Sequence, residues 1–77
     1  MSRTVYHVTY SNELEKWKVI KENSSRVSSY HDTKSAAIEE AKRLAKKNIP
    51  SQVKVHNKDG TISDEWTYGD DPFPPRG

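Results

Sequence analysis

One stretch of the chain, residues 34–47, has apolar side chains at helical spacing, and this feature limits the possible folds most. Intervals of three and four predict an amphipathic helix whose apolar face consists of Ala37, Ile38, Ala41, Leu44 and Ala45. Asp32 and Thr33 offer side-chain oxygens that can cap the start of this helix, and Asn48 and Pro50 mark its end. A single helix cannot bury its apolar face alone, so strands must form the second layer.

The segments before this helix have the composition of strands. Residues 4–10 are β-branched or aromatic except for His7, and residues 15–21 contain a strict alternation of lysine with apolar side chains. The few residues between these segments predict an antiparallel hairpin. Residues 26–30 are a weaker candidate for a third strand.

Two more strands are predicted after the helix. Residues 52–56 alternate again, residues 57–60 form a turn that ends in glycine, and residues 61–67 return as the partner strand. This order of elements predicts an α+β fold, a small two-layer domain with an antiparallel-rich sheet of four or five strands and one helix across one face. The predicted core beneath the helix consists of Tyr6, Val8, Trp17, Val19, Val53, Val55 and Ile62.

The length and composition of the chain limit what else it can contain. Its 77 residues suffice for one domain, predicted as residues 1–77, and 31% hydrophobic residues predict a small core. Without cysteine there is no disulfide and no thiolate metal site. No apolar run approaches the ~20 residues of a membrane span, and the start lacks an apolar signal segment. We therefore expect a soluble, cytoplasmic protein.

The last nine residues, 69–77, are rich in proline and follow two aromatic residues, Trp66 and Tyr68. Because these rings and Phe73 are too apolar to stay in water, we predict that this C-terminal tail packs back onto the domain. Residues 72–75, PFPP, also have the spacing of a polyproline ligand for another protein, which is the alternative interpretation.

Several motifs along the chain occur together in one family. They are His7-Val8, Trp17 with Val19, Arg26, Thr33, the hairpin VKVHNKDGTI at residues 53–62 and the ending YGDDPFPP at residues 68–75. In these motifs the chain resembles a family of short bacterial and phage proteins catalogued as domain of unknown function 2188. Members commonly have a glycine before the tryptophan of the second strand, where this chain has Glu15 and Lys16. The resemblance spans nearly the whole chain and implies a fold without an assigned activity.

The histidines are the first candidates for chemistry. His7 and His56 each neighbour an inward-facing valine, so we predict that they share the sheet face opposite the helix. Two histidines lack the third ligand of a zinc site and the orienting partner of a catalytic site. We therefore expect a non-enzymatic protein without a metal site or a cofactor. Asp70 and Asp71 precede a proline and are interpreted as turn-forming residues.

Charge is distributed unevenly along the chain. Residues 1–58 carry 12 Lys and Arg against 6 Asp and Glu, whereas residues 59–77 carry 1 against 5. A basic body suits an anionic partner such as nucleic acid. One basic group, at the end of the predicted helix, is explained by the helix dipole and by an i,i+4 pair between Glu39 and Arg43. It consists of Lys42, Arg43, Lys46 and Lys47.

Strand alternation places a second basic group on the sheet face opposite the helix. Its members are His7, Thr9, Lys16, Lys18, Lys54 and His56. Ammonium and hydroxyl donors suit phosphate oxygens, and the lack of aromatic residues among them favours contact with the backbone of a duplex. The sequence thus suggests weak, non-specific nucleic-acid binding through this face. The other interpretation is a solvated surface whose lysines prevent aggregation.

A second class of function stays open. The sheet face or the proline-rich tail can serve a protein-interaction module, with the chain as a monomer or a homodimer and without a membrane partner. A stable dimer that covers Lys16, Lys18 and Lys54 would leave this basic face unavailable to nucleic acid.

Overall fold

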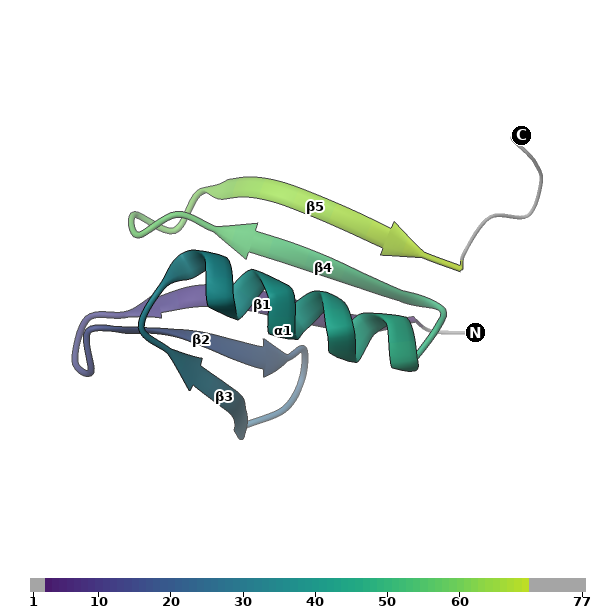
Figure 1. The fold of residues 1–77 in the computed structure, drawn as a ribbon, viewed down its shortest axis with the longest axis horizontal. Coiled ribbons are helices and arrows are strands. Elements are labelled where there is room, and N and C mark those ends of the chain that lie inside the picture. The colour runs from purple at the N-terminus through teal and green to yellow at the C-terminus, as the bar shows by residue number, and fades with distance from the viewer. Residues whose placement is uncertain (1–2, 70–77) are drawn as a thin grey trace.

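The computed structural model describes residues 3–69, which form one five-stranded sheet with a single helix across one face (Figure 1). The strands are β1 (Thr4–Ser11), β2 (Lys16–Lys21), β3 (Val27–His31), β4 (Ser51–His56) and β5 (Ile62–Tyr68), and the helix is α1 (Lys34–Lys47). The α+β prediction is confirmed, including the weaker third strand. The proline-rich part of the predicted tail, residues 70–77, lies outside the described residues. Within residues 3–69, no helix has both the length and the apolar character needed to span a membrane.

The strands lie in the order β3-β2-β1-β4-β5, so β1 is central and β3 and β5 are the edges (Figure 1). The two predicted antiparallel hairpins are confirmed as β1 with β2 and β4 with β5, and β2 pairs with β3 in the same sense. The remaining pair, β1 with β4, is parallel. The connection through α1 makes this pairing feasible, because parallel neighbours need a long crossover.

Side chains at both ends of α1 satisfy free backbone groups. At the start, the Thr33 hydroxyl accepts a hydrogen bond of 3.1 Å from the backbone N–H of Ala36. At the end, the Asn48 side chain donates to the backbone oxygen of Leu44 at 2.8 Å and to the Tyr6 hydroxyl at 3.1 Å. Such bonds compensate for the missing intrahelical partners of a terminus. The bond to Tyr6 also ties the end of the helix to the central strand.

The core lies between α1 and the sheet. Its buried hydrophobic side chains are Tyr6, Val8, Trp17, Val19, Ala37, Ala41, Ala45, Val53 and Val55. Alanines on the inner face of α1 leave little side-chain volume there, so the helix backbone can approach the sheet closely. Ser51 is also buried, and its hydroxyl donates to the backbone oxygen of Ala45. All the predicted strand residues of the core are confirmed except Ile62.

The prediction that Ile62 lies in the core is wrong, since this residue is 50% exposed. The pairing of β4 with β5 shifts register between Val55 and His56, so that Asp64 pairs with Val55 but Ile62 pairs with His56. Directly paired residues share a face of the sheet. The extra residue of this bulge therefore moves Ile62 to the face opposite α1.

Candidate functional site

The sheet face opposite α1, which we call the open face, gathers the six residues that the sequence predicts for it. They are His7, Thr9, Lys16, Lys18, Lys54 and His56. Alternate residues of β1, β2 and β4 are buried against α1, so their neighbours project the other way. The strand register sets Thr9 beside Lys18 and His7 beside Lys54. No helix of the described residues covers this face.

Carboxylates offset part of the positive charge on the open face. The Lys16 ammonium contacts the Asp32 carboxylate, and this hydrogen bond and charge lower the pKa of Asp32 below its ordinary value. Nε2 of His7 lies 2.8 Å from Oε1 of Glu22. Strand alternation gave no sign of these partners, because Asp32 and Glu22 lie just beyond the ends of β3 and β2.

Lys54 and Lys18 lie on the inner strands of the open face. Glu65 on β5 is the cross-strand partner of Lys54, and Tyr30 on β3 is that of Lys18. Among the described residues, Lys18 thus has no carboxylate as an ion-pair or direct cross-strand partner. Tyr30 is 46% exposed, and Ile62 shares the same face. The open face therefore combines nearly balanced charge with two exposed apolar side chains on its edge strands.

Two histidine rings face each other on the open face. Nδ1 of His7 lies 3.0 Å from Nε2 of His56, and the ring centroids are 5.2 Å apart. The other nitrogen of the His56 ring, Nδ1, lies 3.3 Å from the backbone oxygen of Gly60. The predicted shared face is confirmed, but the contact depends on the parallel pairing of β1 with β4, which no local pattern indicated. Within residues 3–69, no group of three or more His, Cys, Asp or Glu could hold a metal ion.

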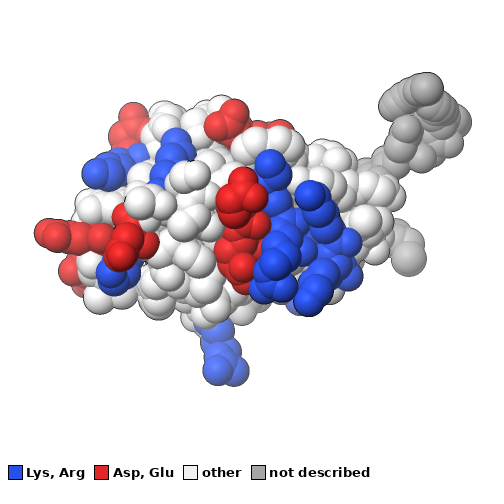
Figure 2. Space-filling model, viewed as in Figure 1, with Lys and Arg blue, Asp and Glu red and all other residues white. Residues whose placement is uncertain are grey.

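A second charged surface lies on the outer side of α1. We call it the basic end, and it consists of Lys42, Arg43, Lys46 and Lys47. These side chains line a surface groove of about 680 Å³ together with His31, Ala36, Glu39 and Glu40. Figure 2 shows a contiguous area of Lys and Arg side chains over the C-terminal half of α1, with acidic side chains beside it.

Aromatic rings of the edge strand β5 lie next to the basic end. The Lys42 ammonium is 4.8 Å from the centre of the Trp66 ring, and the Lys46 ammonium is 5.9 Å from the centre of the Tyr68 ring. Both rings are half-buried against the core. Cations and aromatic faces therefore alternate on this surface. Sequence reasoning missed this arrangement because it depends on how α1 packs against β5.

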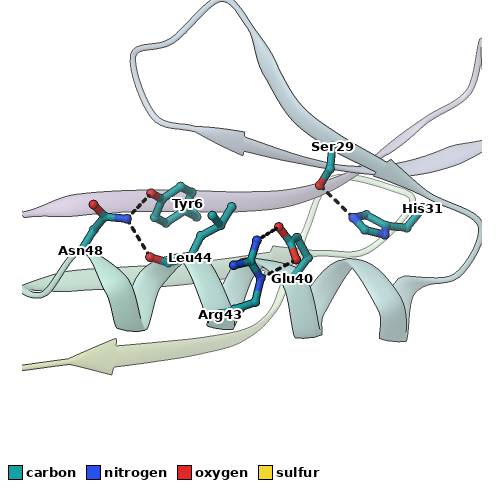
Figure 3. Close-up of polar contacts among 7 residues, drawn as sticks. All are labelled: Tyr6, Ser29, His31, Glu40, Arg43, Leu44 and Asn48. Atoms are coloured by element: carbon teal, nitrogen blue, oxygen red, sulfur yellow. Dashed lines mark hydrogen bonds and ion pairs between the residues drawn. The ribbon is translucent and has the colours of Figure 1, made fainter.

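One residue of the basic end is held by a carboxylate. Nη2 and Nε of Arg43 lie 2.6 Å and 2.9 Å from the two carboxylate oxygens of Glu40 (Figure 3). These bonds lower the pKa of Glu40 and raise that of Arg43. The sequence predicted Glu39 as the partner of Arg43, and that prediction is wrong because Arg43 turns back by three residues instead of four. His31, at the rim of the groove, contacts the Ser29 hydroxyl at 2.8 Å (Figure 3).

Comparison with known proteins shows which family and which relative this chain is similar to. A family model described as "Uncharacterized protein conserved in bacteria (DUF2188)" matches residues 6–68. The chain is also 30% identical over 63 residues to "Uncharacterized protein YycD" of Bacillus subtilis, a match that covers 82% of this chain and 94% of that protein. No solved structure matches the chain. The family match extends from β1 into β5, so it includes both the open face and the basic end.

Proposed function

This chain belongs to the DUF2188 family of uncharacterised bacterial proteins, and we propose that it is a small, non-enzymatic domain that binds the phosphate backbone of nucleic acid. The sequence pattern predicts the open face as the binding surface. The charge distribution of the folded domain favours the basic end of α1 instead. The two surfaces lie on opposite sides of the sheet, so an experiment can separate them.

One observation carries the proposal. The basic end brings four cationic side chains together within six consecutive helix residues, and among the described residues only Arg43 is in an ion pair with a carboxylate. Phosphate oxygens are bound by such Lys and Arg groups, which fix position on the backbone without reading sequence. The binding is therefore expected to be weak and to show little sequence preference.

The aromatic rings beside the basic end add to this proposal. Lys42 and Lys46 lie against Trp66 and Tyr68, so positive charge and aromatic rings occur together on this surface. Proteins that bind single strands combine a basic surface with aromatic side chains on which bases stack. We therefore expect a single strand to bind at least as well as a duplex.

A second candidate function, protein interaction or homodimerisation through the open face, is favoured by a different observation. Tyr30 and Ile62 are 46% and 50% exposed on that face, at opposite edges of the sheet. A partner protein that covers the whole width of this face would remove both side chains from water, which is favourable. Because the carboxylates of Glu22, Asp32 and Glu65 lie among the basic side chains of this face, a protein suits the open face better than a polyanion does.

An NMR titration at low salt with a short duplex and a short single strand tests the proposal. We expect chemical-shift changes at residues 42–47 and 66–68, an affinity of roughly 10⁻⁴–10⁻⁶ M, and a salt slope of about −0.9 per neutralised phosphate on duplex DNA. Changes confined to β1, β2 and β4 would move the site to the open face. No change at low salt would contradict nucleic-acid binding.

Two matched variants locate the surface. Lys46→Gln with Lys47→Gln removes two charges from the basic end, and Lys18→Gln with Lys54→Gln removes two charges from the open face. The first variant should weaken binding roughly tenfold and flatten the salt slope, whereas the second should leave both nearly unchanged. Light scattering on the same samples gives the oligomeric state. A dimer whose formation removes the exposure of Tyr30 would support the interaction function.

A further inference from the structure

The neutral rings of His7 and His56 have two arrangements of protons: in one, Nε2–H of His56 donates to Nδ1 of His7, and in the other both rings donate to their remaining contacts. In the second arrangement, the Glu22 carboxylate and the Gly60 carbonyl are acceptors, so each takes an N–H, from Nε2 of His7 and Nδ1 of His56 respectively. A neutral imidazole has a single N–H. The lone pairs of His7 Nδ1 and His56 Nε2 then point at each other across 3.0 Å. A positive centre between them, either a proton or a metal cation, removes the repulsion.

We propose that His7 and His56 bind a divalent transition-metal cation of the zinc, nickel and copper group through Nδ1 of His7 and Nε2 of His56. Neutral imidazole nitrogens are common ligands of these cations. With bonds of about 2.0–2.1 Å, two neighbouring nitrogens on one cation lie roughly 2.9–3.4 Å apart, for angles between square-planar and tetrahedral. The separation of 3.0 Å lies in this range, and binding requires each ring to turn by roughly 40° so that its lone pair points at the cation instead of at the other nitrogen.

The surroundings of both rings match those of ligating histidines. A histidine that binds a metal commonly donates its other N–H to a carboxylate or a backbone carbonyl, which fixes the ring and strengthens the ligating nitrogen. His7 has the Glu22 carboxylate at 2.8 Å, and His56 has the Gly60 carbonyl at 3.3 Å. Thr9, on the same face, has a buried hydroxyl oxygen without a hydrogen-bond partner among the described residues.

Water completes the coordination, because no third His, Cys, Asp or Glu joins the pair within residues 3–69. The site therefore has two protein ligands and should bind more weakly than structural zinc sites, which have four. The spacing of residues in the sequence did not predict this site, because His7 and His56 are 49 positions apart and come into contact only through the pairing of β1 with β4. The inference does not depend on nucleic-acid binding, since the basic end lies on the other side of the sheet.

Titration of the full chain with zinc chloride tests the site directly. We expect calorimetry to give one zinc ion per chain, and long-range ¹H–¹⁵N spectra of the histidine rings to shift at Nδ1 of His7 and Nε2 of His56. The His31 ring, whose Nε2 contacts Ser29, should not shift. No binding, shifts at His31 instead, or one ion shared by two chains would overturn the proposal of a water-completed two-histidine site.

Variants give a second, independent test. His7→Gln and His56→Gln should each weaken zinc binding by about tenfold or more, whereas the matched control His31→Gln should bind as the unchanged chain does. Glu22→Gln, which keeps the side-chain size but removes the carboxylate, should weaken binding by about tenfold through its effect on His7. Far-UV circular dichroism checks that each variant is folded. Equal affinity of all four variants would overturn the proposal.

Discussion

The ammonium group of Lys42 lies 4.8 Å from the centre of the Trp66 ring, and one helix turn further Lys46 lies 5.9 Å from the centre of the Tyr68 ring. Four helix residues rise about 6 Å, and two strand residues advance about 6.6 Å. Because these steps nearly agree, successive lysines of α1 meet successive rings on the side of β5 that faces the helix. Two cation–π contacts therefore connect α1 to the edge strand β5.

A double-mutant cycle measures the first of these contacts. Lys42→Met and Trp66→Leu, alone and together, should give a coupling free energy of about 0.5–1 kcal/mol in urea unfolding, the range for cation–π pairs near the surface. Lys47→Met combined with Trp66→Leu is the matched control, because Lys47 has no ring contact among the described residues. Equal coupling in both cycles would show that the Lys42 contact contributes nothing specific.

The packing of α1 gives a second prediction. Ala41 is fully buried against the sheet, and Ala36 is exposed near the start of the same helix. Ala41→Asp would bury an unpaired carboxylate and should leave the domain unfolded at room temperature, as judged by far-UV circular dichroism. Ala36→Asp places the same charge near the positive end of the helix dipole and should be neutral or slightly stabilising. A folded Ala41→Asp variant would contradict the assigned helix face.

The features predicted correctly are those that local patterns encode. Helical spacing gave the bounds of α1, and alternation gave the strands and both hairpins. The order of the strands was not predictable in this way, because the parallel pairing of β1 with β4 joins segments that are distant in sequence. The wrong placement of Ile62 has a similar cause, since one bulge reverses the face of every residue beyond it.

The candidate site was predictable only in part for the same reason. Alternation placed Lys16 and His7 on one face, but the carboxylates that pair with them, Asp32 and Glu22, come from positions just outside strands. The contact of His7 with His56 needs the parallel pairing as well. Composition thus overstated the positive charge of the open face. It also gave no reason to weigh the aromatic rings that lie beside the basic end.

A contact between two loops beyond the helix and the sheet gives a third prediction. Gly69 has φ +66°, and a Cβ there would lie 1.8 Å from Cγ2 of Ile49. Gly60 has φ +95° with no atom near its Cβ position. Gly60→Ala should therefore cost roughly 1–2 kcal/mol for the left-handed backbone alone, and Gly69→Ala about 2–4 kcal/mol because Ile49 must also move.

An Ile49→Ala background checks the cause of that difference. Ile49 is 54% exposed, so its truncation alone should be tolerated. In this background Gly69→Ala should cost about as much as Gly60→Ala, as measured by urea unfolding, because the obstructing methyl group is gone. A cost of Gly69→Ala that stays the same with or without the Ile49 side chain would mean that the steric contact is not its source.

The loss of stability at acid pH gives the fourth prediction, which compares two carboxylates whose pKa values are lowered by different contacts. Asp59 accepts hydrogen bonds from the backbone N–H of Thr61 at 3.0 Å and from its hydroxyl at 2.7 Å, and these neutral donors lower the pKa of Asp59 below 3.8. The pKa of Asp32 is also lowered below 3.8, first by the hydrogen bond and then by the charge of Lys16. Both groups are fully exposed, so each effect on stability is small.

A lowered pKa in the folded state means that folding favours the ionised carboxylate. The stabilising effect of the carboxylate is therefore complete above the ordinary pKa of 3.8. It is lost as the pH falls through the lower pKa of the folded state. Asp59→Asn and Asp32→Asn should therefore each destabilise the domain near neutral pH and approach the stability of the unchanged chain once the pH falls below the lowered pKa of the replaced carboxyl group. Salt distinguishes the two, because at 1 M the screening length is about 3 Å. Urea unfolding in 1 M salt should reduce the effect of Asp32→Asn and preserve that of Asp59→Asn. The reverse pattern would assign the charge-based interaction to Asp59 instead.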